Sequence, residues 1–185
     1  MVGTLTIGGA CAALVAGCVA WTFAEYALHR FWGHGPLRFG LFYKEHTRHH
    51  AEGHYMTSNI LKGAFGVSLF FVSVALGLWL KVPTLGVCFG LGFSLAYGYY
   101  EYFHWSLHQY AAGSFYGRWA RRHHFYHHFH DPRMNHGVTS PLWDVIFGTY
   151  RTVSDPVKVP RKLMMRWMCL EQRWPDDFML RGTAR

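Results

Sequence analysis

The stretch that decides the fold runs from residue 60 to residue 103. It reads ILKGAFGVSLFFVSVALGLWL, then Lys81, then VPTLGVCFGLGFSLAYGYYEYF. Each half is apolar over about 20 residues, the length that a helix needs to cross the hydrocarbon core of a bilayer. A segment in lipid must be helical, because lipid offers no partners for exposed backbone groups. With Pro83 favouring a turn, the stretch predicts a transmembrane hairpin over residues 60–80 and 82–106.

Another apolar run lies at residues 5–28, LTIGGACAALVAGCVAWTFAEYAL, and is also long enough to span a bilayer. A cleaved signal peptide is the alternative interpretation. Such peptides begin with a basic segment, whereas no Lys or Arg precedes this run. The run also leads directly into His29, the first of the fourteen histidines. We therefore expect residues 1–28 to form the first transmembrane segment.

The charge distribution predicts the orientation in the membrane. The 185 residues are 51% hydrophobic and 15% charged, whereas soluble domains have about 25% charged residues. Apart from Lys81, every Lys and Arg lies in residues 30–62 or 118–185, which the positive-inside rule places in the cytoplasm. The N-terminus is then outside and three crossings follow, although a re-entrant or paired arrangement near the N-terminus would also fit. The same asymmetry accounts for the net charge of +8, so a nucleic-acid partner is not invoked.

The sequence thus predicts one all-α membrane domain over residues 1–185, a bundle of about three to four transmembrane helices. Residues 118–185 are expected to form a cytoplasmic or interfacial helical cap. Within it, residues 160–174 (PRKLMMRWMCLEQRW) fit an amphipathic helix in the membrane interface or a helix in the core of the cap. The four cysteines form no CxxC pair and predict no disulfide framework.

Histidine is the outlier of the composition, and dense histidine groups usually bind metal. Four groups stand out: HRFWGH at 29–34, HTRHH at 46–50, HWSLH at 104–108 and HFYHH at 124–128. Residues three or four apart share one face of a helix, so three of these groups each point their imidazoles one way. Ten imidazoles suit two ions with about five nitrogens each. The predicted metal ligands are His29, His34, His46, His49, His50, His104, His108, His124, His127 and His128.

The first group is different, because His29 and His34 lie five residues apart. On an ideal α-helix this spacing turns the second side chain about 140° away from the first. We expect the helix to end or bulge between them, at Gly33, Gly35 and Pro36, with His34 reaching back from a loop.

The other histidines fall outside this pattern. His54, His130 and His136 are expected to support the site, gate it or lie on the surface. His123 competes with His124 for the start of the last group, and the spacing favours His124.

Two glutamates lie near the predicted membrane ends of helices. Glu25 precedes His29 by four residues, and Glu101 precedes His104 by three. Each is a candidate to accept the free N–H of a ligand imidazole, with direct metal binding or a plain interfacial role as alternatives. Asp144 is a candidate to orient His128 or to cap a turn.

Two stretches resemble the fatty acid 2-hydroxylases. WTFAEYALHRF at 21–31 is similar to their first histidine box, and GVTSPLWDVIFGT at 137–149 is similar to the run after their last box. The resemblance covers about residues 20–150 and extends to the fatty acid hydroxylase superfamily, membrane enzymes that include sterol desaturases and carotenoid hydroxylases. Carried over by position, its metal ligands are the ten histidines given above. The segment AEGHYM after His50 departs from the proline and aspartate of the 2-hydroxylases, which leaves the substrate open.

The resemblance implies hydroxylation of a lipid acyl chain by O₂ at a pair of iron ions, which zinc can replace in purified protein. No flavin, haem or Cys₄ motif occurs in the chain, so an external donor, a ferredoxin or a cytochrome b5-like protein, is expected. Arg118, Arg121 and Arg122 are candidates to dock it, with simple positive-inside charge as the alternative. The alternative functions are a sterol or carotenoid hydroxylase or desaturase and, outside enzymes, a metal-binding membrane transporter.

The aromatic residues of the third apolar segment have two interpretations. They would line an apolar slot for the lipid, or they would form the aromatic belt at the membrane interface. The residues are Phe93, Tyr97, Tyr99, Tyr100, Tyr102 and Phe103.

Overall fold

The structure is a computed structural model that describes residues 6–170 and 177–182. These residues divide into two compact units, which we describe separately. The first unit contains the chain up to Ala24 together with Thr57–Tyr102, and the second contains Glu25–Met56 together with the chain from Phe103 onward. The prediction of a single domain over residues 1–185 stays a prediction.

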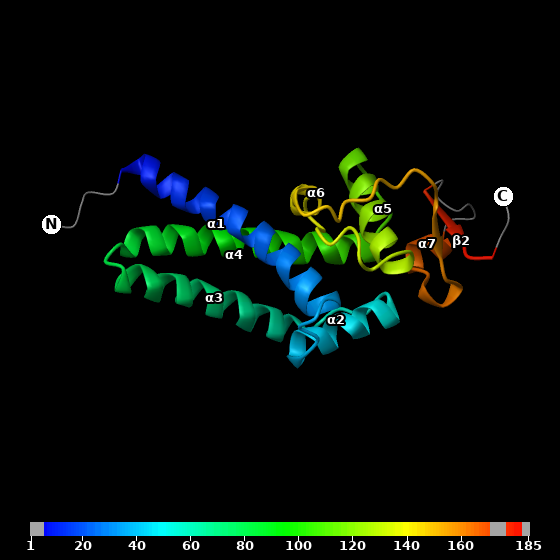
Figure 1. The fold of residues 1–185 in the computed structure, drawn as a ribbon, viewed down its shortest axis with the longest axis horizontal. Coiled ribbons are helices and arrows are strands. Elements are labelled where there is room, and N and C mark those ends of the chain that lie inside the picture. The colour runs from blue at the N-terminus through cyan, green and yellow to red at the C-terminus, as the bar shows by residue number, and fades with distance from the viewer. Residues whose placement is uncertain (1–5, 171–176, 183–185) are drawn as a thin grey trace. The chain divides into compact units, whose positions relative to one another are not determined.

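The first unit consists of long helices. They are α1 (Ile7–Ala27, to Ala24), α3 (Asn59–Trp79) and α4 (Pro83–Gln109, to Tyr102). Helices α3 and α4 form the predicted hairpin and lie side by side (Figure 1). The side chain of Ser58 caps α3 by accepting from the N–H of Leu61, and Pro83 begins α4, a position where its missing N–H costs nothing. Lys81 takes a positive φ of 61° in the turn between them.

Glycines let the hairpin helices approach closely. A Cβ atom on Gly77 or on Gly86 would lie 2.8 Å from the Cα of the other glycine. Small residues at such contacts are typical of helix pairs in membranes, where close backbone packing replaces the hydrophobic effect.

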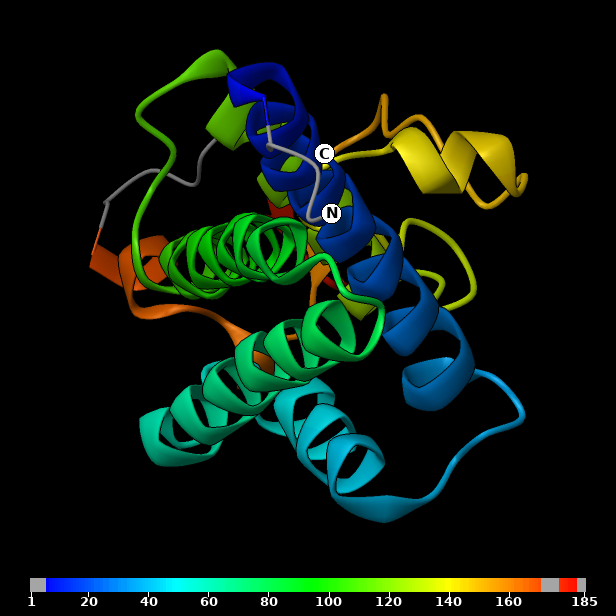
Figure 2. The ribbon, with the colours of Figure 1, turned by 90° about the vertical axis from the view of Figure 1, so that its left-hand side faces the viewer.

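The aromatic residues of α4 divide between two roles. The ring of Trp21 on α1 packs against Phe93, Tyr97 and Tyr100 at centroid distances of 5.4, 4.7 and 5.3 Å. Tyr99 and Tyr102 face outward, with 53% and 64% of their surface exposed. Phe93, Tyr97 and Tyr100 therefore join α4 to α1 within the unit. Tyr99 and Tyr102 have the exposure that an aromatic belt at the membrane interface would have. Figure 2 shows α1 beside the α3–α4 hairpin.

Two helical stretches among the described residues are long and apolar enough to cross a membrane, Ile7–His34 and Asn59–Trp79. Only 11% and 6% of their apolar windows are buried. A core helix of a soluble protein would be buried, so this exposure supports membrane association of the chain. Helix α4 does not meet the same test, because its tyrosines and glycines lower its mean hydropathy. Three crossings therefore stay a prediction.

The second unit begins where α1 passes into the π-helical segment η1 (Leu28–His34). It also contains the end of α4 and the following elements: α2 (Gly40–Glu52), α5 (Phe115–Phe129), α6 (Leu142–Ile146), β1 (Val157–Val159), the 3₁₀ turn η2 (Arg161–Leu163), α7 (Arg166–Leu170) and β2 (Phe178–Leu180). Its apolar core joins α5 to the C-terminal segments through Phe125, Phe129, Val157, Val159, Met165, Trp167, Met168 and Phe178.

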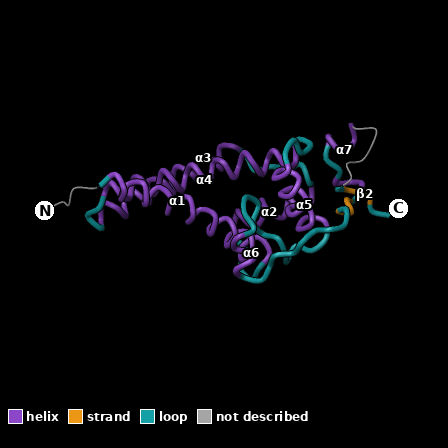
Figure 3. The backbone as a smooth tube through the Cα atoms, turned by 90° about the horizontal axis from the view of Figure 1, so that it is seen from above, coloured by secondary structure: helices purple, strands orange, loops and turns teal. Residues whose placement is uncertain are grey.

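The described residues are mostly helical, as predicted, and two short strands are the departure from an all-α fold. They pair in parallel, with Val157 opposite Phe178. Figure 3 draws the strands in orange. Val157 and Val159 are buried while Lys158 is exposed, the alternation that a half-buried strand requires. Pro156 and Pro160 flank this strand, and a segment so short between prolines carries little helical signal.

The predicted tail helix over residues 160–174 is correct only in part. Its described residues form η2 and α7, and residues 171–174 lie outside the described residues. Met165, Trp167 and Met168 are buried in the core, and the Trp167 Nε1–H donates to the carbonyl of His108 at 3.2 Å. These contacts favour the core helix over the interfacial one, because the apolar side chains already pack inside the protein.

Candidate metal centre

Two groups of five histidines gather in the second unit. Group A is defined by ligand nitrogens that all lie within 4.8 Å of one another, those of His29, His34, His46, His50 and His127. Group B meets the same criterion with His49, His104, His108, His124 and His128. The structure therefore brings together all ten histidines that the sequence singled out, in the five-and-five division that two ions would need.

Each HxxHH box supplies both groups. From α2, His46 and His50 enter group A while His49 enters group B; from α5, His127 enters group A while His124 and His128 enter group B. The spacing predicts that the three imidazoles of each box point one way. They straddle two points instead, and the groups adjoin where the rings of His50 and His128 stack at 4.0 Å with an interplanar angle of 6°.

The unusual spacing of His29 and His34 is solved by the backbone. Both lie in η1, and π-helical hydrogen bonds run from residue i to i+5, so residues five apart return to the same side. Their ring centroids are 5.4 Å apart. The expected bulge is present, but His34 belongs to the π turn and does not reach back from a loop.

The distances between ligand nitrogens fit a metal ion. The Nε2 atom of His34 lies 2.8 Å from that of His46 and 2.9 Å from that of His127. In group B, the Nε2 atom of His124 lies 2.9 Å from that of His108 and 3.0 Å from that of His104. Two imidazoles at right angles on one ion, with bonds of about 2.1 Å, would have nitrogens about 3 Å apart.

Unpartnered nitrogens also indicate a bound cation. Among the residues that the structure describes, the buried Nε2 atoms of His29, His50 and His128 have no hydrogen-bond partner. A buried polar atom without a partner costs free energy. A cation at the centre of each group would satisfy these nitrogens, so the donor set fits a metal pair.

Backbone carbonyls fix the orientation of four of these rings. The Nδ1–H of His49 donates to the carbonyl of Tyr55 at 2.6 Å, and that of His108 to Gly53 at 2.6 Å. The Nδ1–H of His127 donates to Met134 at 2.8 Å, and that of His29 to His136 at 2.5 Å. Because a carbonyl only accepts, Nδ1 carries the proton and Nε2 presents its lone pair to the centre.

These acceptors come from two loops that sequence reasoning missed. We name residues 53–55 loop B and residues 134–136 loop A, after the group each one supports. Each follows an HxxHH box closely and turns back, giving one carbonyl to a histidine of that box and one to a histidine of another helix. The recurrence of a short loop after both boxes is the one sequence signal that points to them.

The predicted partnership of the glutamates with histidines is wrong. The carboxylate of Glu25 accepts from the N–H of Val138, from the N–H of Thr139 at 3.1 Å and from its hydroxyl at 2.6 Å. In the first unit, Glu101 forms an ion pair with Lys62 at 2.6 Å. Glu25 therefore holds the segment after loop A. Four of the imidazoles, His29 among them, donate to backbone carbonyls instead.

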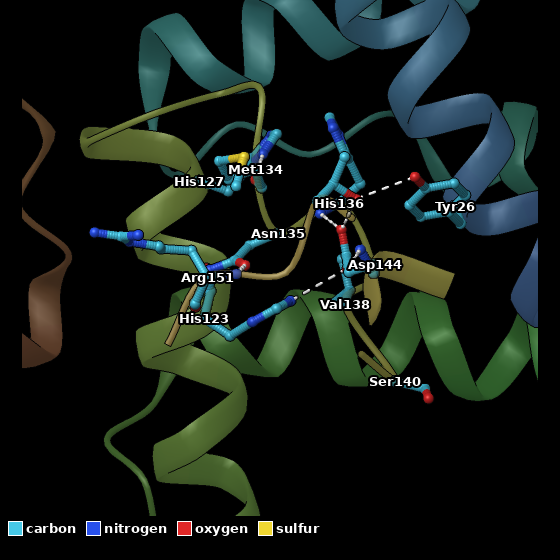
Figure 4. A network of polar contacts seen from close by, with 12 residues as sticks. Tyr26, His123, His127, Met134, Asn135, His136, Val138, Ser140, Asp144 and Arg151 are labelled. Atoms are coloured by element: carbon cyan, nitrogen blue, oxygen red, sulfur yellow. Dashed lines mark hydrogen bonds and ion pairs between the residues drawn. The ribbon is translucent and has the colours of Figure 1, made fainter. Parts of the chain in front are cut away.

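Asp144 holds loop A from the other side and orients no histidine of the two groups. Its carboxylate accepts from the N–H of His136 at 2.8 Å and of Gly137 at 2.7 Å, and from the Thr149 hydroxyl at 2.7 Å. Asp144 is fully buried. Figure 4 shows this network, with His136 between His127 and Tyr26.

The remaining histidines lie outside both groups. The Nε2 atom of His123 is 3.5 Å from the Asp144 carboxylate, which supports the choice of His124 as the ligand. His54 and His130 are exposed. His136 is buried, gives its carbonyl to His29 and directs its Nε2 to the carbonyl of Arg133 at 3.1 Å, so its role is to support the site.

Burial favours the neutral form of five histidines on α2 and α5. It lowers the pKa of His46, His50, His124, His127 and His128 well below the ordinary value, and neighbouring histidines lower it further. A neutral imidazole has the lone pair that a metal ion needs. These neutral imidazoles are therefore available to bind metal cations.

The predicted docking arginines do not form one surface. Arg121 is buried and donates to the carbonyls of Leu107 at 3.0 Å and Ser106 at 3.3 Å, so it caps the end of α4. Burial lowers the pKa of Arg121 to about 10. Arg118 and Arg122 form ion pairs with Asp177 at 3.0 and 3.1 Å. Arg121 is therefore wrong as a docking residue, and the charges of the other two are partly neutralised.

Comparison with known proteins places these features in a family. The profile of the fatty acid hydroxylase family matches residues 14–149. A dihydroceramide fatty acyl 2-hydroxylase of Arabidopsis thaliana is 28% identical over 80% of this chain and 63% of its own length. A fatty acid 2-hydroxylase of Mus musculus is 29% identical over 73% of this chain and 38% of its own. This chain thus spans less than two thirds of these relatives.

One solved structure has the same fold. It is full-length scs7p with only the hydroxylase domain visible, and it matches with a TM-score of 0.63 and 24% identity. The match covers 84% of this chain and 61% of the other.

Proposed function

Because this chain belongs to the fatty acid hydroxylase family, we propose that it hydroxylates a lipid acyl chain with O₂ at a pair of metal ions. The observation that carries the proposal is the pair of adjoining five-histidine groups, with ligand nitrogens about 3 Å apart. Group A would hold one ion and group B the other. Imidazole binds iron, zinc and copper alike, so zinc can occupy the groups in purified protein. The proposed functional ions are iron, which would supply the activation of O₂.

The overall reaction consumes one C–H bond, O₂, two electrons and two protons, and yields an alcohol and water. The electrons would come from an external one-electron carrier, a ferredoxin or a cytochrome b5-like protein. The chain's own residues hold the ring orientations through loops A and B and exclude water from the centre, since His29, His49, His108, His124 and His127 are buried.

The substrate is proposed from the relatives. Their names describe hydroxylases of dihydroceramide fatty acyl chains and of fatty acids, so we propose a fatty acid or a sphingolipid-type acyl chain. A sterol or carotenoid hydroxylase or desaturase of the same superfamily is the second candidate. A metal transporter is not favoured, because the ligands gather at two adjoining points and do not form a path.

The proposed topology places the N-terminus outside and three crossings in the membrane. Supporting this, Lys and Arg concentrate in residues 30–62 and 118–185. All fourteen histidines would then lie at or near the cytoplasmic face, as would the helical cap.

The proposal is tested by expressing the chain in membranes that lack it and comparing the extracted lipids by mass spectrometry. The inactive variant is the double substitution His127→Ala and His128→Ala, which removes one ligand from each group. His130→Ala is the matched control, because His130 is exposed on the same helix end and lies outside both groups.

The expected result is a lipid that has gained one oxygen atom in the wild type and in His130→Ala only. Loss of two hydrogen atoms would instead identify a desaturase. Absence of any new lipid together with absence of bound metal would refute the proposal.

A further inference from the structure

Helix α6 exposes apolar side chains and buries its charged residue, the reverse of a surface helix in a soluble protein. Its exposed side chains are apolar: Leu142, Val145 and Ile146 have 47%, 59% and 57% of their surface exposed. Its one charged residue, Asp144, is fully buried. A helix on a water-facing surface does the reverse, with apolar residues inside and charges outside.

This orientation is fixed by Asp144. Its carboxylate accepts from the N–H groups of His136 and Gly137 and from the Thr149 hydroxyl. A rotation of α6 that buried Val145 and Ile146 would remove that carboxylate from three donors and leave them unpaired. The exposed apolar side is therefore a stable feature of the unit.

The residues that follow α6 indicate which environment its exposed apolar side meets. The Phe147 ring, directly after α6, stacks on the Tyr26 ring at 5.4 Å with an interplanar angle of 12°. The Tyr26 hydroxyl also bonds the Thr149 hydroxyl at 3.1 Å (Figure 4). Tyr26 belongs to the helical stretch Ile7–His34, which is long and apolar enough to span a membrane. Because the residues directly after α6 contact the C-terminal part of that stretch, α6 lies near the end of the candidate span.

We propose that α6 is inserted into the bilayer, with Leu142, Val145 and Ile146 in contact with the acyl chains of phospholipids. A lipid surface is the partner that an apolar, uncharged and exposed helix face fits. The same helix holds loop A through Asp144, and loop A orients His29 and His127. Lipid would thus contact the helix that holds loop A, the loop that supports group A. The inference rests on the proposed membrane topology and not on the proposed reaction.

The test introduces the photocrosslinking amino acid p-benzoylphenylalanine at Val145 in the full chain, reconstituted in phosphatidylcholine nanodiscs. Phe71 on α3, with 63% of its surface exposed in a candidate span, is the position expected to label lipid. Lys158 on β1, exposed and polar, is the position expected to label none. Irradiation is followed by mass spectrometry of the protein–lipid adducts.

Position 145 is expected to give phosphatidylcholine adducts with a yield like that of position 71, while position 158 stays at background. Labelling at 145 no higher than at 158, with position 71 labelled, would overturn the proposal. A crosslink from 145 to a second copy of the chain would overturn it as well, because the apolar side would then be a protein interface.

Position 146 serves as the second site if the change at 145 disturbs folding, with bound metal per chain as the measure of folding. The result is independent of turnover: lipid adducts at position 145, with no new lipid and no bound metal in the expression test, would support the inserted α6 and contradict the proposed reaction. Oxidised lipid without adducts would do the opposite.

Discussion

Loop B and loop A each present two carbonyl oxygens to histidines of one group, but they are held in place very differently. Buried polar side chains hold loop A and the segment after it. Asp144 and Asn135 hold the loop and Glu25 holds the following segment, with 0%, 0% and 4% of their surface exposed. Asn135 accepts from the N–H of Arg151 at 2.7 Å and donates to its carbonyl at 3.1 Å. The bonds from Asp144 to the N–H groups of His136 and Gly137 are buried, so losing one leaves a buried group unpaired.

Loop B depends on backbone conformation and on contacts near the surface. Gly53 has a φ of 58°, and its N–H donates to the carbonyl of His49 at 3.0 Å. The Tyr55 hydroxyl donates to Glu45 at 2.7 Å, and Arg48 lies 3.9 Å from the Tyr55 ring centroid. Water can replace such contacts at modest cost. The comparison predicts that group A is sensitive to single polar substitutions and that group B is tolerant of them.

The largest effect is expected for Asp144→Ala. It leaves the N–H groups of His136 and Gly137 buried without an acceptor, so the free energy of unfolding should fall by about 3–5 kcal/mol. Metal analysis should show loss of the group A ion before loss of the group B ion. Asp155→Ala, at an exposed carboxylate, is the control and should change neither quantity. Equal loss of metal from both groups would contradict the assignment of loop A to group A and of loop B to group B.

Glu25→Gln should come next. The amide keeps the shape of the side chain, but it has one acceptor oxygen for the three donors of Val138 and Thr139. The affinity of group A for metal should fall about 10–100-fold, as for other groups that support metal ligands indirectly. Competition with a chelator measures it. Glu52→Gln, at an exposed glutamate paired with Arg48, should leave the affinity unchanged, and a matching loss there would mean that charge alone matters.

Gly53→Ala tests loop B. The positive φ costs an alanine about 1 kcal/mol, and the new Cβ would lie 3.3 Å from the carbonyl oxygen of Leu163. Group B should therefore lose metal affinity by less than about tenfold. Gly182→Ala repeats the strain at φ 98° in an exposed turn. If Gly182→Ala lowers the metal affinity of group B to the same extent, the effect of backbone strain is general and does not act through loop B.

The smallest effect is expected for Tyr55→Phe, compared with Tyr26→Phe. Tyr55 loses one hydrogen bond near the surface, which should cost less than about 1 kcal/mol and leave the affinity of group B within about twofold. Tyr26 is fully buried, and its loss leaves the Thr149 hydroxyl and the Arg30 guanidinium without that partner, so a larger loss of thermal stability is expected. Thermal unfolding of both variants measures the difference. A greater loss in Tyr55→Phe would reverse the ranking of the loops.

The sequence alone determined the long helices and the identity of the clustered histidines. Apolar runs of membrane length and Pro83 predicted the α3–α4 hairpin, and spacings of three and four predicted which imidazoles share a helix face. These features follow from local geometry, because the period of a helix spans only a few residues of the sequence.

Only the tertiary structure decided how the ten histidines divide, how His34 enters group A and what orients the rings. The division depends on where α2 and α5 meet, and the π turn of η1 has no period that a sequence pattern displays. The acceptors at Gly53, Tyr55, Met134 and His136 are backbone carbonyls, which every residue carries, so no residue type marks them. The sequence marked Glu25 and Asp144 as candidate supporting residues, yet their hydrogen-bond donors lie on segments that reach them only through folding.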